Sequence, residues 1–153
     1  MVTSYQGATI EKVKDTKSQS VQVSDWMSTR LITFHPDQLI FEVMEILLTH
    51  RISGGPVVDD SGNLVGVISE GDCLKELIKG KYNNVPTLEG KVSDHMGTNV
   101  ITIEPQVNIF DAAKKFLHLR LRRLPVVQLG KLIGQISQKD IMKAVKSMHS
   151  TTW

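Results

Sequence analysis

The sequence has little cysteine, few aromatic residues and no long apolar run, and each shortage excludes a class of protein. One cysteine among 153 residues cannot form an internal disulfide or supply a cysteine-rich zinc site. No apolar stretch approaches the roughly 18 residues of a membrane span, and the N-terminus lacks the apolar core of a secretory signal. The 18 Lys and Arg nearly balance 16 Asp and Glu, so charge indicates nucleic-acid binding only weakly. We therefore expect a soluble, cytoplasmic globular protein.

What the sequence does have is an internal repeat. The segment Val-Ser-Asp-Trp-Met at 23–27 returns as Val-Ser-Asp-His-Met at 92–96, and Pro-Val-Val at 56–58 returns at 125–127, both 69 residues later. After one residue is lost from the second hairpin, Gly-x-Ile-Ser-x-x-Asp at 66–72 returns at 134–140. These matches predict two repeats at 23–80 and 92–148, a lead-in at 1–22, a linker at 81–91 and a tail at 149–153.

Each repeat is predicted to fold as strand, helix, strand, strand, helix. In the first repeat, residues 31–34 are a short β-branched run, and 39–50 are apolar at helical spacing. Gly54 and Gly55 are expected to stop this helix, a hairpin follows over 56–69, and a second helix begins near Glu70. The expected fold class is α/β (α+β), with two β-α-β-β-α repeats packed face to face in pseudo-twofold symmetry. Neither repeat alone is large enough for a good core.

These repeated motifs resemble the cystathionine β-synthase (CBS) domain, whose tandem pairs form a Bateman module. The resemblance rests on Ser-Asp-x-Met, Pro-Val-Val and Gly-x-Ile-Ser-x-x-Asp, each present twice and in order. It implies a regulatory module that binds adenosine-containing ligands in clefts between the repeats and is not an enzyme. No required cofactor and no metal site are expected, and the implied ligands are AMP, ADP or ATP.

The resemblance also assigns roles to the last motif. Asp72 and Asp140 would accept hydrogen bonds from ribose hydroxyls, while Ser69, Ser137 and the helix starts would face phosphate. The alternative is structural, because Ser-x-x-Asp at a helix start is also an ordinary capping box. The two roles are compatible.

The second repeat carries more positive charge around this motif. Arg122, Arg123 and Lys139 stand where relatives often place phosphate-binding cations, whereas the first repeat has small neutral residues and Glu70. A solvated basic surface is the alternative. We predict that the second site prefers phosphorylated ligands and that the first is empty or accepts a less charged adenosyl compound. The second site comprises Thr102, Arg122, Arg123, Pro125, Ser137, Lys139 and Asp140, and the first comprises Thr33, Ser53, Pro56, Ser69 and Asp72.

Several other functions stay open at this stage. S-adenosylmethionine or a dinucleotide presents the same ribose as AMP, and the arginines at 120, 122 and 123 leave nucleic-acid binding as a less favoured alternative. A small enzyme is less favoured still, because no nucleophile-elbow, phosphate-loop or metalloprotease motif occurs. The expected partners are an adenosine nucleotide, a second copy in a homodimer and an unidentified regulated protein, without a membrane.

Overall fold

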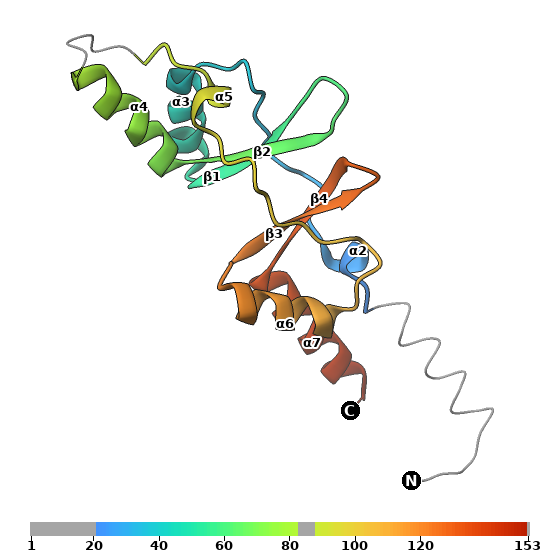
Figure 1. The fold of residues 1–153 in the computed structure, drawn as a ribbon. Coiled ribbons are helices and arrows are strands. Elements are labelled where there is room, and N and C mark those ends of the chain that lie inside the picture. Colours follow the sequence, from blue (N-terminus) through green and yellow to red (C-terminus); the bar gives the residue numbers. More distant parts are fainter. Residues whose placement is uncertain (1–20, 83–87, 153) are drawn as a thin grey trace. The chain divides into compact units, whose positions relative to one another are not determined.

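The computed structural model describes residues 21–82 and 88–152 (Figure 1). Most of the expected lead-in (1–20), part of the expected linker (83–87) and Trp153 lie outside the described residues. The fold mixes helices and short two-stranded sheets, which confirms the predicted fold class. The elements of the first repeat are α2 (Val23–Trp26), α3 (Ile40–His50), β1 (Gly54–Val58), β2 (Leu64–Ser69) and α4 (Glu70–Tyr82). Those of the second are α5 (Val92–His95), α6 (Ile109–Leu119), β3 (Arg123–Gln128), β4 (Lys131–Ser137) and α7 (Gln138–Thr152).

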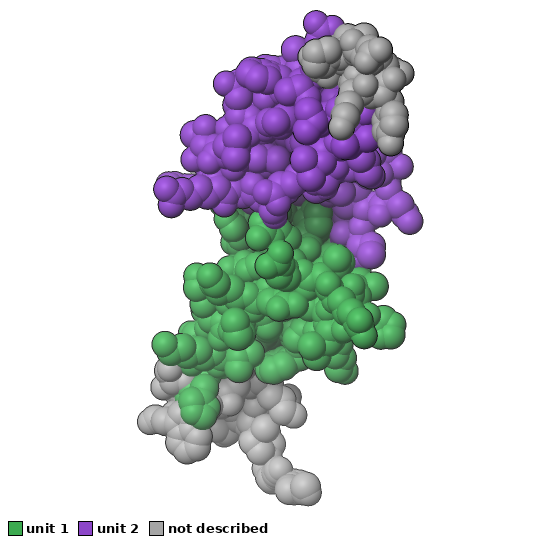
Figure 2. All heavy atoms as spheres, turned by 90° about the vertical axis from the view of Figure 1, so that its left-hand side faces the viewer, with its two compact units in different colours: residues 1–29, 103–126, 134–153 green, residues 30–102, 127–133 purple. Residues whose placement is uncertain are grey.

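The chain forms two compact units that do not coincide with the two sequence repeats (Figure 2). Unit 1 comprises residues 1–29, 103–126 and 134–153, and unit 2 comprises residues 30–102 and 127–133. Unit 1 therefore combines α2 of the first repeat with α6 and α7 of the second. Unit 2 combines α5 of the second repeat with α3 and α4 of the first.

Backbone hydrogen bonds hold each exchanged short helix in its unit. In unit 1, the N–H of Val23 donates to the carbonyl of Val107 at 2.9 Å, and Ser28 and Gln135 exchange bonds of 2.8 and 2.9 Å. In unit 2, the N–H of Val92 donates to the carbonyl of Gln38 at 2.9 Å. Val67 and Gly97 exchange backbone hydrogen bonds of 2.9 and 2.8 Å. The Ser-Asp-x-Met motif is thus the segment through which each repeat completes the other unit.

Glycines let the exchanged segments approach the hairpins closely. A Cβ on Gly134 would lie 2.5 Å from Met27 Sδ and 2.9 Å from the carbonyl oxygen of Ser28. A Cβ on Gly66 would lie 2.7 Å from Met96 Sδ and 2.8 Å from the carbonyl oxygen of Gly97. No side chain fits at those separations, so the repeated glycine of Gly-x-Ile-Ser is required by packing.

The first strand predicted in each repeat is reduced to a single residue, which corrects the expected element order. Phe34 forms one parallel bridge with Val57, and Ile103 forms one with Val126. The hairpins themselves are present: β1 pairs antiparallel with β2, and β3 pairs with β4. In the second hairpin Leu129 and Gly130 both have positive φ, 53° and 82°, as a two-residue hairpin turn requires.

Helix α3 ends differently from the prediction. Gly54 and Gly55 do not stop α3, because they already belong to β1. The helix ends instead at Arg51, which adopts the left-handed conformation with φ 56°, and α6 ends in the same way at Arg120 with φ 55°. Left-handed residues end many helices, although glycine is the usual one.

The core of unit 2 is built from apolar side chains of α3 and the hairpin. Phe34, Ile40, Val43, Val57 and Ile68 are at most 2% exposed. In unit 1, five large residues are likewise at most 2% exposed: Ile109, Phe116, Leu124, Val126 and Ile136. Both cores fill the space between a helix pair and one face of a hairpin, as expected for amphipathic elements.

Candidate functional site

Three segments of each repeat are brought together at the start of its last helix. In unit 2, the N–H of Glu70 donates to the carbonyl of Ser53 at 2.9 Å, and that of Phe34 donates to the carbonyl of Pro56 at 2.9 Å. These bonds gather the segments that carry Thr33, Ser53, Pro56, Ser69 and Asp72. All five predicted residues of the first site therefore lie in one compact unit.

The second repeat forms the same arrangement. The N–H of Gln138 donates to the carbonyl of Arg122 at 3.0 Å, and that of Ile103 donates to the carbonyl of Pro125 at 3.0 Å. Six of the seven predicted residues lie in unit 1. The exception is Thr102, which directly precedes Ile103 but is grouped with unit 2, so its part in this site stays a prediction.

Ser and Asp of the repeated motif cap the two helices. Asp140 Oδ2 accepts the N–H of Ser137 at 2.8 Å and its hydroxyl at 2.9 Å, and the N–H of Asp140 donates to Ser137 Oγ at 3.1 Å. Asp72 Oδ2 accepts the N–H and hydroxyl of Ser69, each at 2.9 Å. The capping role considered from sequence is therefore real.

The cap uses one carboxylate oxygen and leaves the other to different partners. In α4, Asp72 Oδ1 lies 3.6 Å from Lys75 Nζ, and the Asp72 side chain is 14% exposed. A carboxylate held this way has a fixed orientation and lone pairs beyond those of the cap. Each aspartate can thus cap its helix and still accept further hydrogen bonds.

The surroundings of the two helix starts differ in charge. Arg122, Arg123 and Lys139 are exposed side chains of unit 1. The equivalent positions of unit 2 hold Ser53, Gly54 and Gly71. Exposed cations beside backbone N–H groups at a helix start form an environment that favours phosphate. Of the two helix starts compared, that of α7 combines these features and that of α4 does not.

Gln138 is a site residue whose side-chain contact was not predicted from sequence. Its Nε2 donates to the carbonyl of Leu121 at 2.7 Å, so Gln138 holds the segment before β3 through both its backbone and its side chain. Glu70, its equivalent in α4, has no side-chain N–H to donate. The signal available in the sequence was this amide-for-carboxylate difference at matching repeat positions.

Two other ionisable groups have shifted acidities that suit structural roles. Burial raises the pKa of the Cys73 thiol, and the nearby Asp72 and Glu70 carboxylates add to this. Cys73 is 4% exposed, so it packs as a small buried apolar side chain. The N–H of Asn63 lowers the pKa of Asp59 by hydrogen bonding to its carboxylate at 2.9 Å in the β1–β2 turn.

Within residues 21–82 and 88–152, no three His, Cys, Asp or Glu side chains gather as metal ligands would. No helix in these same ranges is long and apolar enough to cross a bilayer.

Solved structures of similar chains share this fold. The chain aligns with CBSX2 of Arabidopsis thaliana in complex with AMP at a TM-score of 0.72 and 32% identity, covering 84% of this chain and 98% of that one. It aligns with the CBS domain pair of MJ0100 in complex with 5′-methylthioadenosine and S-adenosylmethionine at a TM-score of 0.61 and 30% identity, covering 83% and 97%.

Sequence comparisons agree with the structural ones. The chain is 30% identical to YhcV of Bacillus subtilis over 129 residues, covering 84% of this chain and 86% of that protein. It is 32% identical to MJ1225 of Methanocaldococcus jannaschii over 126 residues, but spans only 43% of that longer protein. The CBS-domain family model matches twice, at residues 23–79 and 92–147. The chain therefore belongs to the CBS domain family, as a tandem pair.

Proposed function

We propose that this chain is a regulatory module that binds adenosine-containing nucleotides at the starts of α4 and α7. The observation that carries the proposal is the Ser–Asp cap, which fixes a carboxylate at each helix start beside the segment preceding a hairpin. The similar CBSX2 structure contains AMP, which supports this ligand class. Regulation would follow if ligand binds two states of the module with unequal affinity and a partner protein recognises one of them.

The two sites are proposed to differ in ligand. Arg122, Arg123 and Lys139 favour AMP, ADP or ATP at the α7 site. At the α4 site, Glu70 repels phosphate and the neighbouring residues are small and neutral, so a less charged adenosyl compound fits better. The MJ0100 structure, with 5′-methylthioadenosine and S-adenosylmethionine, supports the second ligand type.

Isothermal titration calorimetry on matched variants tests this proposal. Asp140→Asn keeps a cap acceptor but removes the charge that receives ribose hydroxyls, and we expect AMP affinity to fall about tenfold or more. Asp72→Asn is the matched control and should leave AMP affinity within about twofold of the parent. Absence of AMP binding to the parent would overturn the nucleotide proposal, and equal losses in both variants would overturn the asymmetry.

We also propose that the module forms a homodimer through its helices. Leu48 on α3 and Leu117 on α6 are 77% and 80% exposed, and an exposed apolar patch, where contiguous, marks an interaction surface. Leu48→Asp and Leu117→Asp should weaken the dimer without disturbing the fold, as measured by sedimentation velocity and circular dichroism. A parent chain that stays monomeric at 100 µM would contradict the proposal.

A further inference from the structure

Gln138, the first residue of α7, is bonded to both peptide groups that flank Arg122. Its backbone N–H donates to the carbonyl of Arg122 at 3.0 Å, and its side-chain Nε2 donates to the carbonyl of Leu121 at 2.7 Å. The carbonyl of Leu121 belongs to the peptide group before the Arg122 Cα, and the carbonyl of Arg122 belongs to the one after it. Because each peptide group is planar, the two bonds together restrict the backbone dihedrals of Arg122 and the direction in which its side chain leaves the backbone.

Regular secondary structure does not supply this restraint. Helix α6 ends at Leu119, Arg120 follows in the left-handed conformation, and β3 begins at Arg123. Leu121 and Arg122 therefore lie between a helix and a strand. Leu121 is half-buried and Arg122 is exposed. Gln138 thus fixes an irregular connection at the residue that carries an exposed guanidinium.

The same turn of α7 carries the carboxylate proposed to receive ribose. Asp140 Oδ2 accepts the N–H and the hydroxyl of Ser137 at 2.8 and 2.9 Å, so Asp140 is anchored to the residue directly before Gln138. In a nucleotide, a short covalent link joins the phosphate to the ribose, so the groups that receive them must keep a set separation. The bonds of Gln138 connect the turn that holds Asp140 to the segment that holds Arg122, and this connection sets such a separation.

The equivalent position of unit 2 can make only the backbone bond. It holds Glu70, whose N–H donates to the carbonyl of Ser53 at 2.9 Å. A carboxylate accepts hydrogen bonds but has no N–H to donate, so Glu70 cannot bond the carbonyl of Ile52 as Gln138 bonds that of Leu121. The negative charge of Glu70 also repels phosphate. One amide-for-carboxylate difference therefore alters both the restraint and the charge beside the helix start.

We infer that Gln138 is a positioning residue for phosphate in the α7 site: its side-chain bond to Leu121 holds Arg122 where the guanidinium meets the phosphate of a nucleotide bound by Asp140. The inference rests on the proposed nucleotide site and names a specificity determinant within it. An arginine loses conformational freedom when it binds phosphate, and a backbone that is already held in place lowers that cost. Adenosine has no phosphate and gains nothing from the restraint, so the bond should favour AMP over adenosine.

Isothermal titration calorimetry of AMP and of adenosine tests the inference in the full chain, with Asp72→Asn present throughout to weaken the α4 site. Gln138→Met keeps the backbone bond and a side chain of similar length but removes the Nε2 donor. We expect the dissociation constant of AMP to rise about fivefold, as for one lost hydrogen bond, and that of adenosine to stay within about 1.5-fold. Damage to the start of α7 would raise both constants alike, so their ratio reports positioning.

A double-variant cycle shows whether Gln138 acts through Arg122. Arg122→Met should lower the preference for AMP over adenosine about tenfold, because it removes a cation that binds phosphate. Adding Gln138→Met should then change the preference by less than about 1.5-fold, because no guanidinium remains to be positioned. Gln128→Met is the matched control: it makes the same side-chain change at the exposed last residue of β3 and should leave the affinity for both ligands unchanged.

The contrary results separate this inference from the function on which it rests. A preference for AMP that Gln138→Met leaves unchanged would overturn the positioning role while leaving the nucleotide site intact. A double variant whose loss equals the product of the two single losses would do the same. A parent chain that binds neither ligand, or that binds AMP no better than adenosine, would overturn the phosphate preference of the α7 site together with the role of Gln138.

Discussion

Phe34 packs over Gly55 in unit 2, whereas the equivalent positions of unit 1 hold Ile103 and Leu124. A Cβ on Gly55 would lie 2.8 Å from Phe34 Cε2, so the large ring requires the glycine. Ile103 and Leu124 are 3% and 0% exposed, so the smaller branched residue is accompanied by a larger neighbour on the strand. The two repeats keep the same helices and strands but place the larger side chain at different positions, because a close-packed core must be filled in both.

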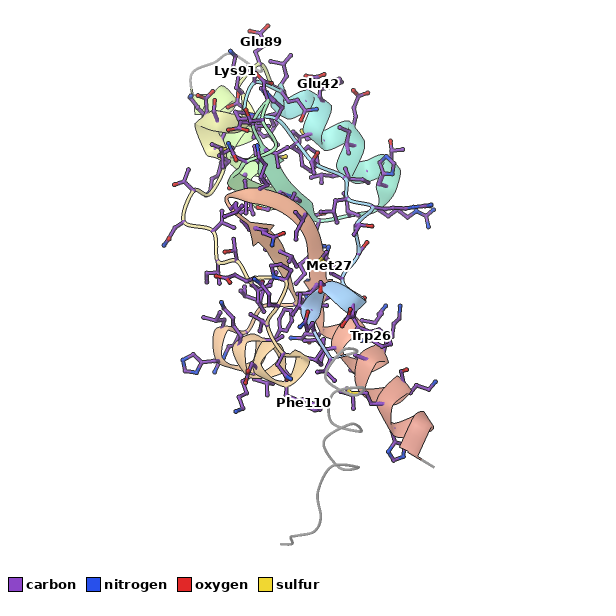
Figure 3. All side chains as sticks on the ribbon, turned by 90° about the vertical axis from the view of Figure 1, so that its right-hand side faces the viewer. Trp26, Met27, Glu42, Glu89, Lys91 and Phe110 are labelled. Carbon is purple, nitrogen blue, oxygen red and sulfur yellow. The ribbon has the colours of Figure 1, made fainter. Side chains whose placement is uncertain are left out.

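A second pair of equivalent positions differs in polarity. In unit 2, His95 Nε2 lies 2.6 Å from Glu76 Oε1, and Glu76 Oε2 accepts the N–H of Gly90 at 2.9 Å. Glu76 is 6% exposed. In unit 1 the same positions hold the half-buried Trp26 (Figure 3) and the fully buried Ala144. A polar pair joins α5 to α4 in unit 2, whereas the equivalent positions of unit 1 hold a large aromatic residue and a small one.

The largest loss of stability is expected when a large side chain is placed at Gly55 while Phe34 is kept. Gly55→Leu inserts a side chain into space occupied by Phe34 and should lower the free energy of unfolding by about 3 kcal/mol. Phe34→Ile/Gly55→Leu reproduces the unit 1 combination and should recover at least half of the loss in urea denaturation. A double variant no more stable than Gly55→Leu would show that the two positions are not coupled.

The Glu76–His95 pair is expected to contribute slightly less to the free energy of unfolding. Glu76→Ala leaves the N–H of Gly90 and the His95 ring without their acceptor, which should cost about 2 kcal/mol of unfolding free energy. Adding His95→Trp introduces the unit 1 solution and should regain part of that stability. Glu104→Ala serves as the control in the same urea titrations, and a loss below about 0.5 kcal/mol for Glu76→Ala would contradict the role given to the pair.

Adding a positive charge at the start of α4 should make the first site resemble the second. Gly71→Lys places a lysine at the position equivalent to Lys139, and a Cβ there meets only Ser69 Oγ, at 3.7 Å. We expect AMP affinity at the α4 site to rise about fivefold, near 1 kcal/mol, because a cation is added beside a helix start. Calorimetry in the Asp140→Asn background isolates this site, and Gly71→Gln is the uncharged control. An equal gain in both variants would assign the effect to helix formation.

The smallest effect on stability is expected at the left-handed residue that ends α3 in unit 2 and α6 in unit 1. Arg51 and Arg120 hold left-handed conformations that glycine adopts without a steric penalty. Arg51→Gly and Arg120→Gly should each stabilise the protein by about 0.5–1 kcal/mol, measured as a small rise in Tm. Opposite signs in the two units would reveal a contact made by only one arginine side chain.

Much of the fold could be predicted because local chemistry repeats. The apolar spacing at 40–50 specified α3, the Leu129–Gly130 turn specified the second hairpin, and Ser69 with Asp72 marked the start of α4. The end of α3 was assigned to the wrong residues, because an arginine in a left-handed conformation carries no sequence signal. The first strands were overestimated, because a β-branched run does not reveal whether a neighbouring strand pairs with it.

The candidate sites were predicted in part for similar reasons. The Ser–Asp motif and the cations of the second repeat are visible in the sequence, and the structure places the matched Ser and Asp together. The bond from Gln138 to the carbonyl of Leu121 joins residues 17 positions apart, so no local pattern announces it. Such contacts depend on how the β3–β4 hairpin brings the start of α7 beside the segment that precedes β3.

The sequence by itself determined the two repeats, their helices and hairpins, the capping motif and the unequal charge of the two sites, because these depend on residue order and short-range bonding. Tertiary structure decided which pieces form each compact unit. The Ser-Asp-x-Met helix of each repeat bonds to the body of the other, so α2 completes unit 1 and α5 completes unit 2. The repeated motifs alone do not reveal this exchange, because their order in the chain does not say which body each one bonds to. Long-range backbone pairing and close approach at Gly66 and Gly134 join each motif to its unit.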